Sequence, residues 1–400
     1  MNKGLKYTCL FGGGAVRGMS YIGTVNAFEN LGIKYDTLGG SSVGSIFAAL
    51  LAVGYTSDEM KDIFAQVNFN LFRDISLGIG PIFAFSKGEV FLDWIRDLIE
   101  SKFYGEKYKK GYNKAVTFND IQKNLVILTT DLGSFKCKEF SRFETPDYEI
   151  ASAVRISCCM PGLMKPVEYN NTLLVDGDLQ KSWPMWKLSD NLMKSNDRIL
   201  ELRLEGYYDD NNISGVDYAN AVYSCMTASA TAFVKELYGN KDRFDYIVLN
   251  TGDVVVVDFN ISDEKRNELI KIGYEQTINY FKAELPEKKN IIKNCYECIQ
   301  FHLLKIKKYI ESSKPIKVKI ELGDLYTDIV EYHNVIDERD IEIISNFKEL
   351  FYKNIKYPAL FGKAKIKDGT ILLSELQKLI KHISDKLDEL SLYMEYIDNL

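Results

Sequence analysis

The chain has 400 residues, 46% of them hydrophobic, and a formal net charge of −6. A chain of this length and apolar content can bury a large core, so the composition excludes a disordered protein. The small acidic charge also excludes the strongly basic composition of proteins that bind nucleic acid through bulk electrostatics.

The seven cysteines are odd in number and scattered through apolar segments. This usage is typical of a reducing compartment, where cysteine serves as a small hydrophobe. The apolar stretch Leu5–Phe11 is too short for the core of a signal peptide, and Ser45–Val53, the longest one, falls far below the roughly 20 residues that cross a bilayer. The sequence therefore predicts a cytoplasmic protein with no signal peptide or transmembrane helix, which would reach membranes only peripherally.

Strand-like and helix-like segments alternate over the first two thirds of the chain. This alternation is typical of a mostly parallel sheet covered by helices. We expect strands at 5–11, 35–38, 124–130, 173–175, 199–204, 246–250 and 254–257. We expect helices over about 21–31 and 43–52, one capped by Ser57, and one from Ser262 to about Phe281.

The composition changes after Pro286, which is expected to interrupt the last of these helices. Ten lysines against four glutamates lie between Lys282 and Lys319. A solvated helix face explains this excess more simply than docking on anionic lipid, which stays open as an alternative. We therefore predict a core domain over residues 1–285 and a smaller, mainly helical domain over residues 286–400.

A long helix with an a/d seam is predicted at the end of the chain. The seam consists of apolar residues at alternating four- and three-residue spacing, namely Leu376, Ile380, Ile383, Leu387, Leu390, Met394 and Ile397. It covers only about three heptads, so packing within the chain's own C-terminal domain is the preferred interpretation. A homo-oligomer or a partner protein docked on this helix is the alternative.

The segment Gly40-Ser41-Ser42-Val43-Gly44 fits the G-x-S-x-G pattern of a nucleophile elbow. In such a turn a strand passes sharply into a helix and holds the serine in a strained backbone conformation, while Gly40 and Gly44 leave room for the neighbouring chain. N–H groups at the start of the helix would face an oxyanion formed at Ser42. The pattern is weak alone, but the predicted strand before it and the apolar helix after it strengthen the assignment.

A histidine usually serves as the base for such a serine, and the chain has only three, His302, His333 and His382. All lie beyond residue 285 in polar, helix-like segments, where surface or packing roles are the simpler interpretation. Asp176 ends a predicted apolar strand and is followed by Gly177, so its carboxylate would sit at the carboxyl edge of the sheet. A carboxylate within hydrogen-bond reach of Ser42 can accept its proton, although a plain Asp-Gly turn is the alternative.

A glycine-rich loop, Gly12-Gly13-Gly14-Ala15-Val16-Arg17-Gly18, follows the first strand. A dinucleotide-binding loop has the pattern G-x-G-x-x-G, and the glycine that would complete it here, Gly18, falls one position too late. Backbone N–H groups around Gly13, Gly14 and Ala15 can instead line an oxyanion hole beside the nucleophile. Arg17 would support the geometry of this loop or meet an anionic head group.

Two further segments have simple structural interpretations. Cys295, Cys298 and His302 share one face of a predicted helix; zinc needs a fourth ligand, and because none is evident we expect an apolar helix face and no metal. The glycine-hinged segment Leu77–Phe85 is expected to be a loop packed on the core, with a flap over an acyl groove as the alternative.

Four blocks in this order resemble the patatin-like phospholipase family, which is related in its catalytic core to the cytosolic phospholipases A2. They are Gly12–Gly18, Gly40–Gly44, Arg155–Gly162 and Asp176-Gly177. The resemblance, which runs from about residue 5 to about residue 280, implies a three-layer α/β/α core and a Ser42–Asp176 dyad without histidine or cofactor. It also implies hydrolysis of phospholipid or other acyl-glycerol esters at a membrane or micelle surface, through an acyl-enzyme.

The chain departs from the family pattern at Ala15 and Asp178. The family usually has glycine at the position of Ala15, and a positive φ there would cost this residue about 1 kcal/mol. Glycine or alanine is commoner at the position of Asp178, which puts a second negative charge beside the dyad. Both departures favour an alternative in which the protein is a catalytically weak lipid-binding or scaffold protein. An acyltransferase that uses an acceptor other than water is a further alternative.

Overall fold

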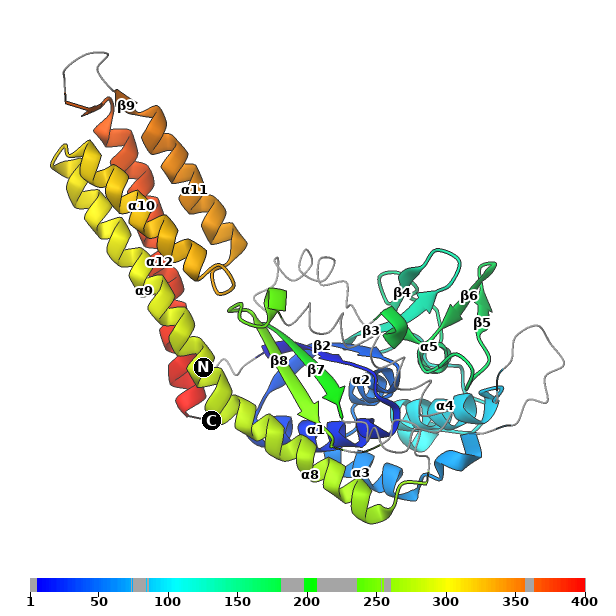
Figure 1. Cartoon of the computed structure of the whole chain (residues 1–400). Coiled ribbons are helices and arrows are strands. Elements are labelled where there is room, and N and C mark those ends of the chain that lie inside the picture. Colours follow the sequence, from blue (N-terminus) through cyan, green and yellow to red (C-terminus); the bar gives the residue numbers. More distant parts are fainter. Residues whose placement is uncertain are drawn as a thin grey trace, which may run out of the picture. The chain divides into compact units, whose positions relative to one another are not determined.

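The structure, a computed structural model, describes residues 6–72, 74, 84, 86–180, 198–206, 236–252, 254, 260–356 and 363–399 (Figure 1). The chain divides into two compact units, Met1–Lys235 with Arg243–Tyr280, and Glu236–Asp242 with Phe281–Leu400. The domain boundary near residue 285 remains a proposal. The segment Glu236–Asp242 belongs to the second unit although it lies between two strands of the first in sequence.

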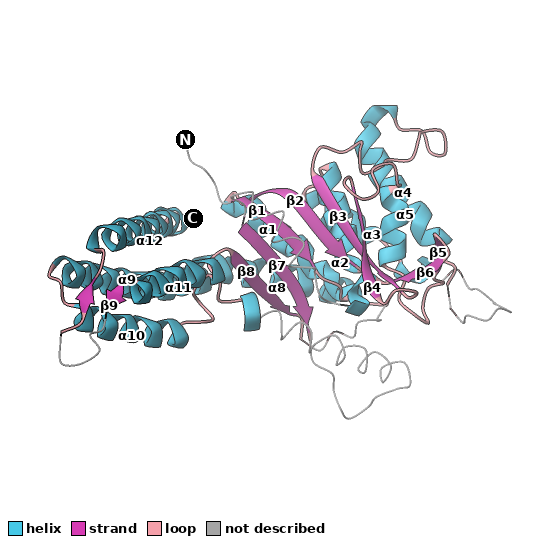
Figure 2. Cartoon of the chain, turned by 90° about the horizontal axis from the view of Figure 1, so that it is seen from above, coloured by secondary structure: helices cyan, strands magenta, loops and turns pink. Residues whose placement is uncertain are grey.

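The first unit is built on an eight-stranded sheet in the order β5-β6-β3-β2-β1-β7-β8, with β4 also paired to β3 (Figure 2). Neighbouring strands are parallel from β3 to β8: β3 (Asn124–Asp131), β2 (Lys34–Ser41), β1 (Lys6–Phe11), β7 (Arg198–Glu205) and β8 (Phe244–Asn250). The strands at the other end pair antiparallel: β4 (Lys136–Ser141), β5 (Val167–Tyr169) and β6 (Thr172–Val175). The predicted mostly parallel sheet is confirmed, whereas β4 and β5 were not predicted.

Helices flank this sheet, which confirms the predicted α/β class. They are α1 (Ser20–Leu31), α2 (Val43–Val53), α3 (Ser57–Gln66), α4 (Glu89–Tyr104), α5 (Ile150–Ser157) and α8 (Asp263–Asn279), with short 3₁₀ turns η1 (Ala15–Met19), η2 (Phe69–Phe72), η3 (Gly105–Lys107) and η4 (Gly177–Gln180). The apolar helix α2 contacts β1, β2 and β3. Helices α1 and α8 approach closely at glycines, since a Cβ on Gly23 would meet the Ile270 carbonyl oxygen at 1.8 Å and one on Gly273 would meet that of Ser20 at 1.8 Å.

One predicted helix cap and one predicted helix break are wrong. Thr56, not Ser57, caps α3, because its side chain accepts the Glu59 N–H in a capping box while the Ser57 hydroxyl contacts Glu29. Pro286 does not interrupt the helix that Ser262 caps. The π-helical turn η5 (Tyr280–Glu284) follows α8 and leads directly into α9 (Leu285–Glu311), where Pro286 occupies the first turn and needs no N–H partner.

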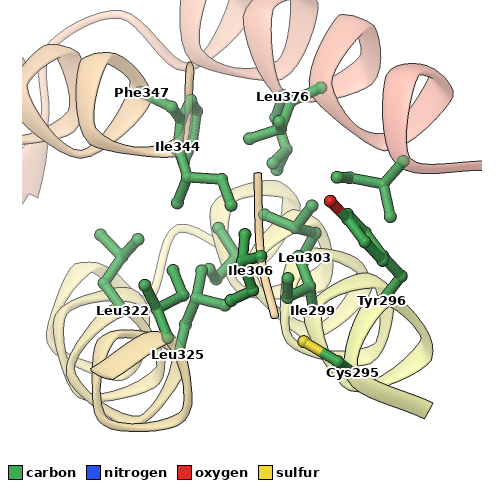
Figure 3. Packing of buried hydrophobic residues seen from close by; sticks show 14 of the residues in the cluster. Cys295, Tyr296, Ile299, Leu303, Ile306, Leu322, Leu325, Ile344, Phe347 and Leu376 are labelled. Atoms are coloured by element: carbon green, nitrogen blue, oxygen red, sulfur yellow. The ribbon is translucent and has the colours of Figure 1, made fainter. Parts of the chain in front are cut away.

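The second unit is mainly helical, as predicted. It contains α9, α10 (Pro315–Glu331), α11 (Glu338–Lys353), α12 (Gly369–Asp398) and the two short strands β9 (Ile355–Lys356) and β10 (Lys365–Ile366). Its apolar core is drawn from all four helices (Figure 3). The predicted a/d seam contributes Leu376, Ile383, Leu387 and Leu390 to this core, so α12 packs within its own unit as expected.

Some expectations fall on residues outside those described. They include the predicted strand residues 255–257 and all of the segment 77–85 except Ala84; Val254 is described but lies outside any strand. None of the described helices combines the length and the apolar character that a membrane crossing requires.

Candidate active site

Strands β2 and β6 run toward each other along one edge of β3. β2 pairs parallel with β3 as far as Ser41 opposite Leu128, and β6 pairs antiparallel with Val175 opposite Thr130. β4 occupies the opposite edge of β3 over the same residues. The residues that follow the two converging strands, Ser42 and Asp176, therefore meet beside the middle of β3.

Ser42 stands at the sharp turn between β2 and α2. Its φ is 50° and its ψ is −132°, a backbone conformation that residues other than glycine rarely adopt. The turn is tight on both sides, because a Cβ on Gly40 would meet the Gly44 carbonyl oxygen at 2.4 Å and one on Gly44 would meet the Phe11 carbonyl oxygen at 2.1 Å. The local geometry is that of a nucleophile elbow, and glycine is required at both flanking positions.

The Ser42 hydroxyl donates a hydrogen bond to Asp176 Oδ2 at 2.7 Å. Asp176 is fully buried and Ser42 is 7% exposed. Two further hydrogen bonds fix Asp176. Its Oδ1 accepts the Asp178 N–H at 2.8 Å, and the backbone N–H of Asp176 donates to the Cys159 carbonyl at 3.0 Å. Gly177 lets the chain turn against β3, because a Cβ there would lie 2.0 Å from the Leu128 carbonyl oxygen.

Residues at the end of α5 hold the elbow from the other side. The Ser42 N–H donates to Ser157 Oγ at 2.9 Å, and Ser157 in turn donates to the Leu128 carbonyl at 2.7 Å. Cys158 Sγ donates to the Ser42 carbonyl at 3.2 Å. Burial raises the pKa of the Cys158 thiol well above its usual value, so this group is a neutral donor and not a nucleophile.

The glycine-rich loop follows β1 and continues into η1, next to the elbow. A Cβ on Gly18 would meet a Val43 methyl group at 2.5 Å, which places the loop against the first turn of α2. Ala15 has φ 45°, so the positive φ anticipated at this departure from the family pattern is present. The cost of about 1 kcal/mol is therefore incurred.

Asp178 ties this loop to the elbow. Its Oδ1 accepts the Gly13 N–H at 3.1 Å and the Ser41 hydroxyl at 3.0 Å, and it lies 3.2 Å from Arg203 Nη1. Arg203 also donates to Glu201 at 2.6 Å, and all three charged side chains are buried. The Gly13 N–H therefore points to a carboxylate, which leaves the amides of Gly14 and Ala15 as the remaining candidates among the predicted oxyanion donors.

The sequence does not reveal that Asp178 and Arg203 brace the site, because the hydrogen bonds join residues up to 165 positions apart.

Arg17 is buried, and its Nε donates to the Val254 carbonyl at 2.8 Å. Gly206 lies close to it, since a Cβ on Gly206 would meet the Arg17 guanidinium at 2.7 Å. This position favours support of the loop over contact with a head group.

The three histidines all lie in the second unit. His302 contacts Glu321 and Asp328, His382 contacts Asp340, and His333 contacts the carbonyl of Val330. Each therefore has partners within that unit, and the hydroxyl of Ser42 is paired with a carboxylate instead.

Residues 10–185 match the family model described as Patatin-like phospholipase. Uncharacterized protein YqhO of Bacillus subtilis is 24% identical over 293 residues, which cover 68% of this chain and 97% of that protein. Probable lipid hydrolase 463L of Invertebrate iridescent virus 6 is 27% identical over 187 residues (44% of this chain, 61% of that protein). Lysophospholipase NTE1 of Cryptococcus neoformans is 28% identical over 187 residues, which cover 46% of this chain but only 10% of that much longer protein.

Proposed function

Because the chain belongs to the patatin-like phospholipase family through residues 10–185, we propose that it hydrolyses fatty-acyl esters of phospholipids with Ser42 as nucleophile and Asp176 as base. The observation that carries the proposal is the 2.7 Å hydrogen bond between the two side chains at the start of α2. A serine in direct contact with a buried, rigidly held carboxylate can be deprotonated as it attacks, without a histidine.

In the proposed reaction Asp176 Oδ2 takes the Ser42 proton while Ser42 Oγ bonds to the acyl carbonyl carbon. The negative charge that develops on the carbonyl oxygen is placed near the N–H groups of Gly14, Ala15 and the first turn of α2. When the tetrahedral intermediate collapses, the ester C–O bond breaks and the leaving alcohol takes the proton from Asp176. Water then attacks the acyl-Ser42 ester, gives its proton to Asp176, and the fatty acid leaves as Ser42 regains a proton.

A catalytically weak lipid-binding protein is the rival proposal. Two observations favour it, the strained φ of 45° at Ala15 and the engagement of the Gly13 N–H by Asp178. The strain at Ala15 costs the loop about 1 kcal/mol. The contact of Gly13 with Asp178 removes one donor for an oxyanion, and one donor is worth about a hundredfold or more in rate. An acyltransferase would use the same first half-reaction and differ only in the acceptor.

The test is release of fatty acid from phosphatidylcholine vesicles and of p-nitrophenol from an acyl ester. Ser42→Ala and Asp176→Asn should each lower turnover by about a thousandfold or more, whereas Ser152→Ala, a matched change at a serine that contacts Glu149, should keep the parent rate. Equal turnover in all four proteins would refute the mechanism.

Labelling by a fluorophosphonate probe separates the proposal from its rival. The parent should be labelled at Ser42 and the Ser42→Ala variant should not. A folded parent that takes up no label would favour the scaffold. Transfer of the acyl group to added glycerol in preference to water would identify an acyltransferase.

A further inference from the structure

Three side chains with metal-ligating atoms converge between α9 and α10 in the second unit. Cys298, His302 and Asp328 form the one such cluster found among the described residues, and their Sγ, ring nitrogen and carboxylate oxygen all lie within 4.8 Å of one another. Asp328 Oδ2 lies 2.8 Å from His302 Nε2 and 3.0 Å from Cys298 Sγ. We propose that Cys298, His302 and Asp328 bind a divalent transition-metal ion, Zn²⁺ being the ion that best fits a sulfur, nitrogen and oxygen ligand set.

Helical spacing brings the first two ligands together. Cys298 and His302 are four residues apart on α9 and so lie one above the other on the same face. Asp328 comes from the last turn of α10, which packs against α9. The neighbouring Cys295 is separate from this cluster, since it is 1% exposed and belongs to the apolar core of the unit (Figure 3). The cluster in the structure therefore differs from the one considered in the sequence: it lacks Cys295 and includes Asp328, which sequence spacing does not reveal.

The second ring nitrogen of His302 is held by a carboxylate. His302 Nδ1 lies 2.7 Å from Oε1 of the buried Glu321, and Lys305 Nζ lies 2.8 Å from the same oxygen. A carboxylate on the far nitrogen is the usual outer-shell partner of a metal-bound histidine, because it fixes the N–H on that side and turns the other lone pair toward the metal. The charge of Glu321 is balanced by Lys305, so the negative charge of Asp328 faces the site.

A neutral imidazole cannot satisfy both contacts by hydrogen bonds alone. It carries one N–H, so one ring nitrogen would direct its lone pair at a carboxylate oxygen less than 3 Å away. The conflict is removed either by a second proton on the ring or by a cation bound between Nε2, Asp328 and the Cys298 sulfur. Zinc would displace the thiol proton and place a thiolate, a carboxylate and Zn²⁺ together with no net charge.

The present distances are close to those that a metal requires. Ideal tetrahedral zinc sites place nitrogen and oxygen ligands roughly 3.4 Å apart and sulfur and oxygen roughly 3.6 Å apart. The Asp328 oxygen would therefore move away from its two neighbours by about half an ångström. Its side chain is 30% exposed, which permits this shift, gives the ion a path from solvent and leaves a fourth coordination position for water.

The experiment uses the full chain, purified under reducing conditions and stripped of metal, with Co²⁺ as a spectroscopic probe and Zn²⁺ as competitor. We expect one Co²⁺ per chain, a thiolate-to-cobalt absorption band, and displacement of the ion by Zn²⁺. Cys298→Ser should abolish the band and weaken binding at least tenfold, and Cys295→Ala, the matched change at the cysteine outside the cluster, should leave both unchanged.

Asp328→Asn gives a second test that keeps the size of the side chain. It should weaken Co²⁺ binding at least tenfold while the circular-dichroism melting curve stays close to that of the parent. Absence of the thiolate band in the parent, or a band that survives in Cys298→Ser, would overturn the proposal and leave a doubly protonated His302 as the explanation of the contacts. None of these readouts depends on hydrolytic activity, so the outcome is independent of the proposed function.

Discussion

Two non-glycine residues of the candidate site, Ala15 and Ser42, have φ values of 45° and 50°. Each costs about 1 kcal/mol or more, and such strain persists only where surrounding contacts determine the conformation. For Ser42 those contacts are its hydrogen bonds to Asp176 and Ser157. Ala15 is the first residue of η1, and the loop that leads into it is held by Asp178 through the Gly13 N–H.

Asp178 is therefore expected to position the oxyanion loop, although it does not touch the acyl group in the proposed reaction. Asp178→Asn should lower kcat about tenfold and leave KM within about twofold, because the loop acts on the transition state more than on bound substrate. Steady-state kinetics on micellar substrate provide the test, with melting temperature as a check on folding. A changed KM at constant kcat would assign Asp178 to substrate binding instead.

Local features of the sequence predict Ser42 and Asp176. These features are the turn residues around each of them and the lack of a histidine before residue 285. The contacts of Asp178 with Ser41 and Arg203 could not be inferred, since they depend on which strands become neighbours. The same is true of Asp328, which joins Cys298 and His302 only after α9 and α10 pair.

At the scale of elements, β6 matters more than its four residues suggest. It runs antiparallel to β3 and thereby brings Asp176 back to the end of β2. The sequence indicated a strand here but not its direction, because apolar runs of this length carry no information about pairing partners. Strands β4 and β5 were missed because they are polar and partly exposed.

Asp131, at the end of β3, couples the turn before β4 to the start of β6. Its carboxylate accepts hydrogen bonds from the Thr172 and Ser134 hydroxyls and from the Gly133 N–H. The hydrogen bond from Thr172, followed by those from Ser134 and Gly133, lowers the pKa of Asp131 below its ordinary value.

A carboxyl whose pKa is lower in the folded than in the unfolded chain stabilises the fold above the unfolded pKa of about 3.9, and this contribution is lost as the pH falls through the folded pKa. Asp131→Asn should therefore lower the free energy of unfolding at pH 7, by less than about 1 kcal/mol because the group is near solvent. The difference in melting temperature between parent and variant should shrink as the pH falls below about 3.9. A difference that is constant from pH 2.5 to 7 would contradict this assignment.

At the scale of the whole molecule, the chain passes between its two units more than once. Glu236–Asp242 belongs to the second unit, while β7 before it and β8 after it belong to the first. A sequence boundary drawn at one position cannot describe this arrangement, because the segment lies far from residue 285 and has no composition of its own to mark it. Charged side chains attach it to the second unit: Asp242 pairs with Lys289, and Lys241 donates to the carbonyls of His333 and Ile336.

Lys289 is fully buried, and its ammonium group donates to the Asp242 carbonyl at 2.6 Å and to the Asp242 carboxylate at 2.8 Å. Lys289→Met should destabilise the second unit by about 3 kcal/mol, since it removes the ammonium group that pairs with a buried carboxylate at 2.8 Å. Hydrogen exchange of the α9 and α12 amides provides the measurement, because it reports the stability of this unit separately from the sheet.

The double variant Lys289→Met with Asp242→Asn should recover much of the loss, since replacing both members of a buried pair costs far less than removing one. Additive losses in the double variant would show that Lys289 acts through packing rather than through its charge.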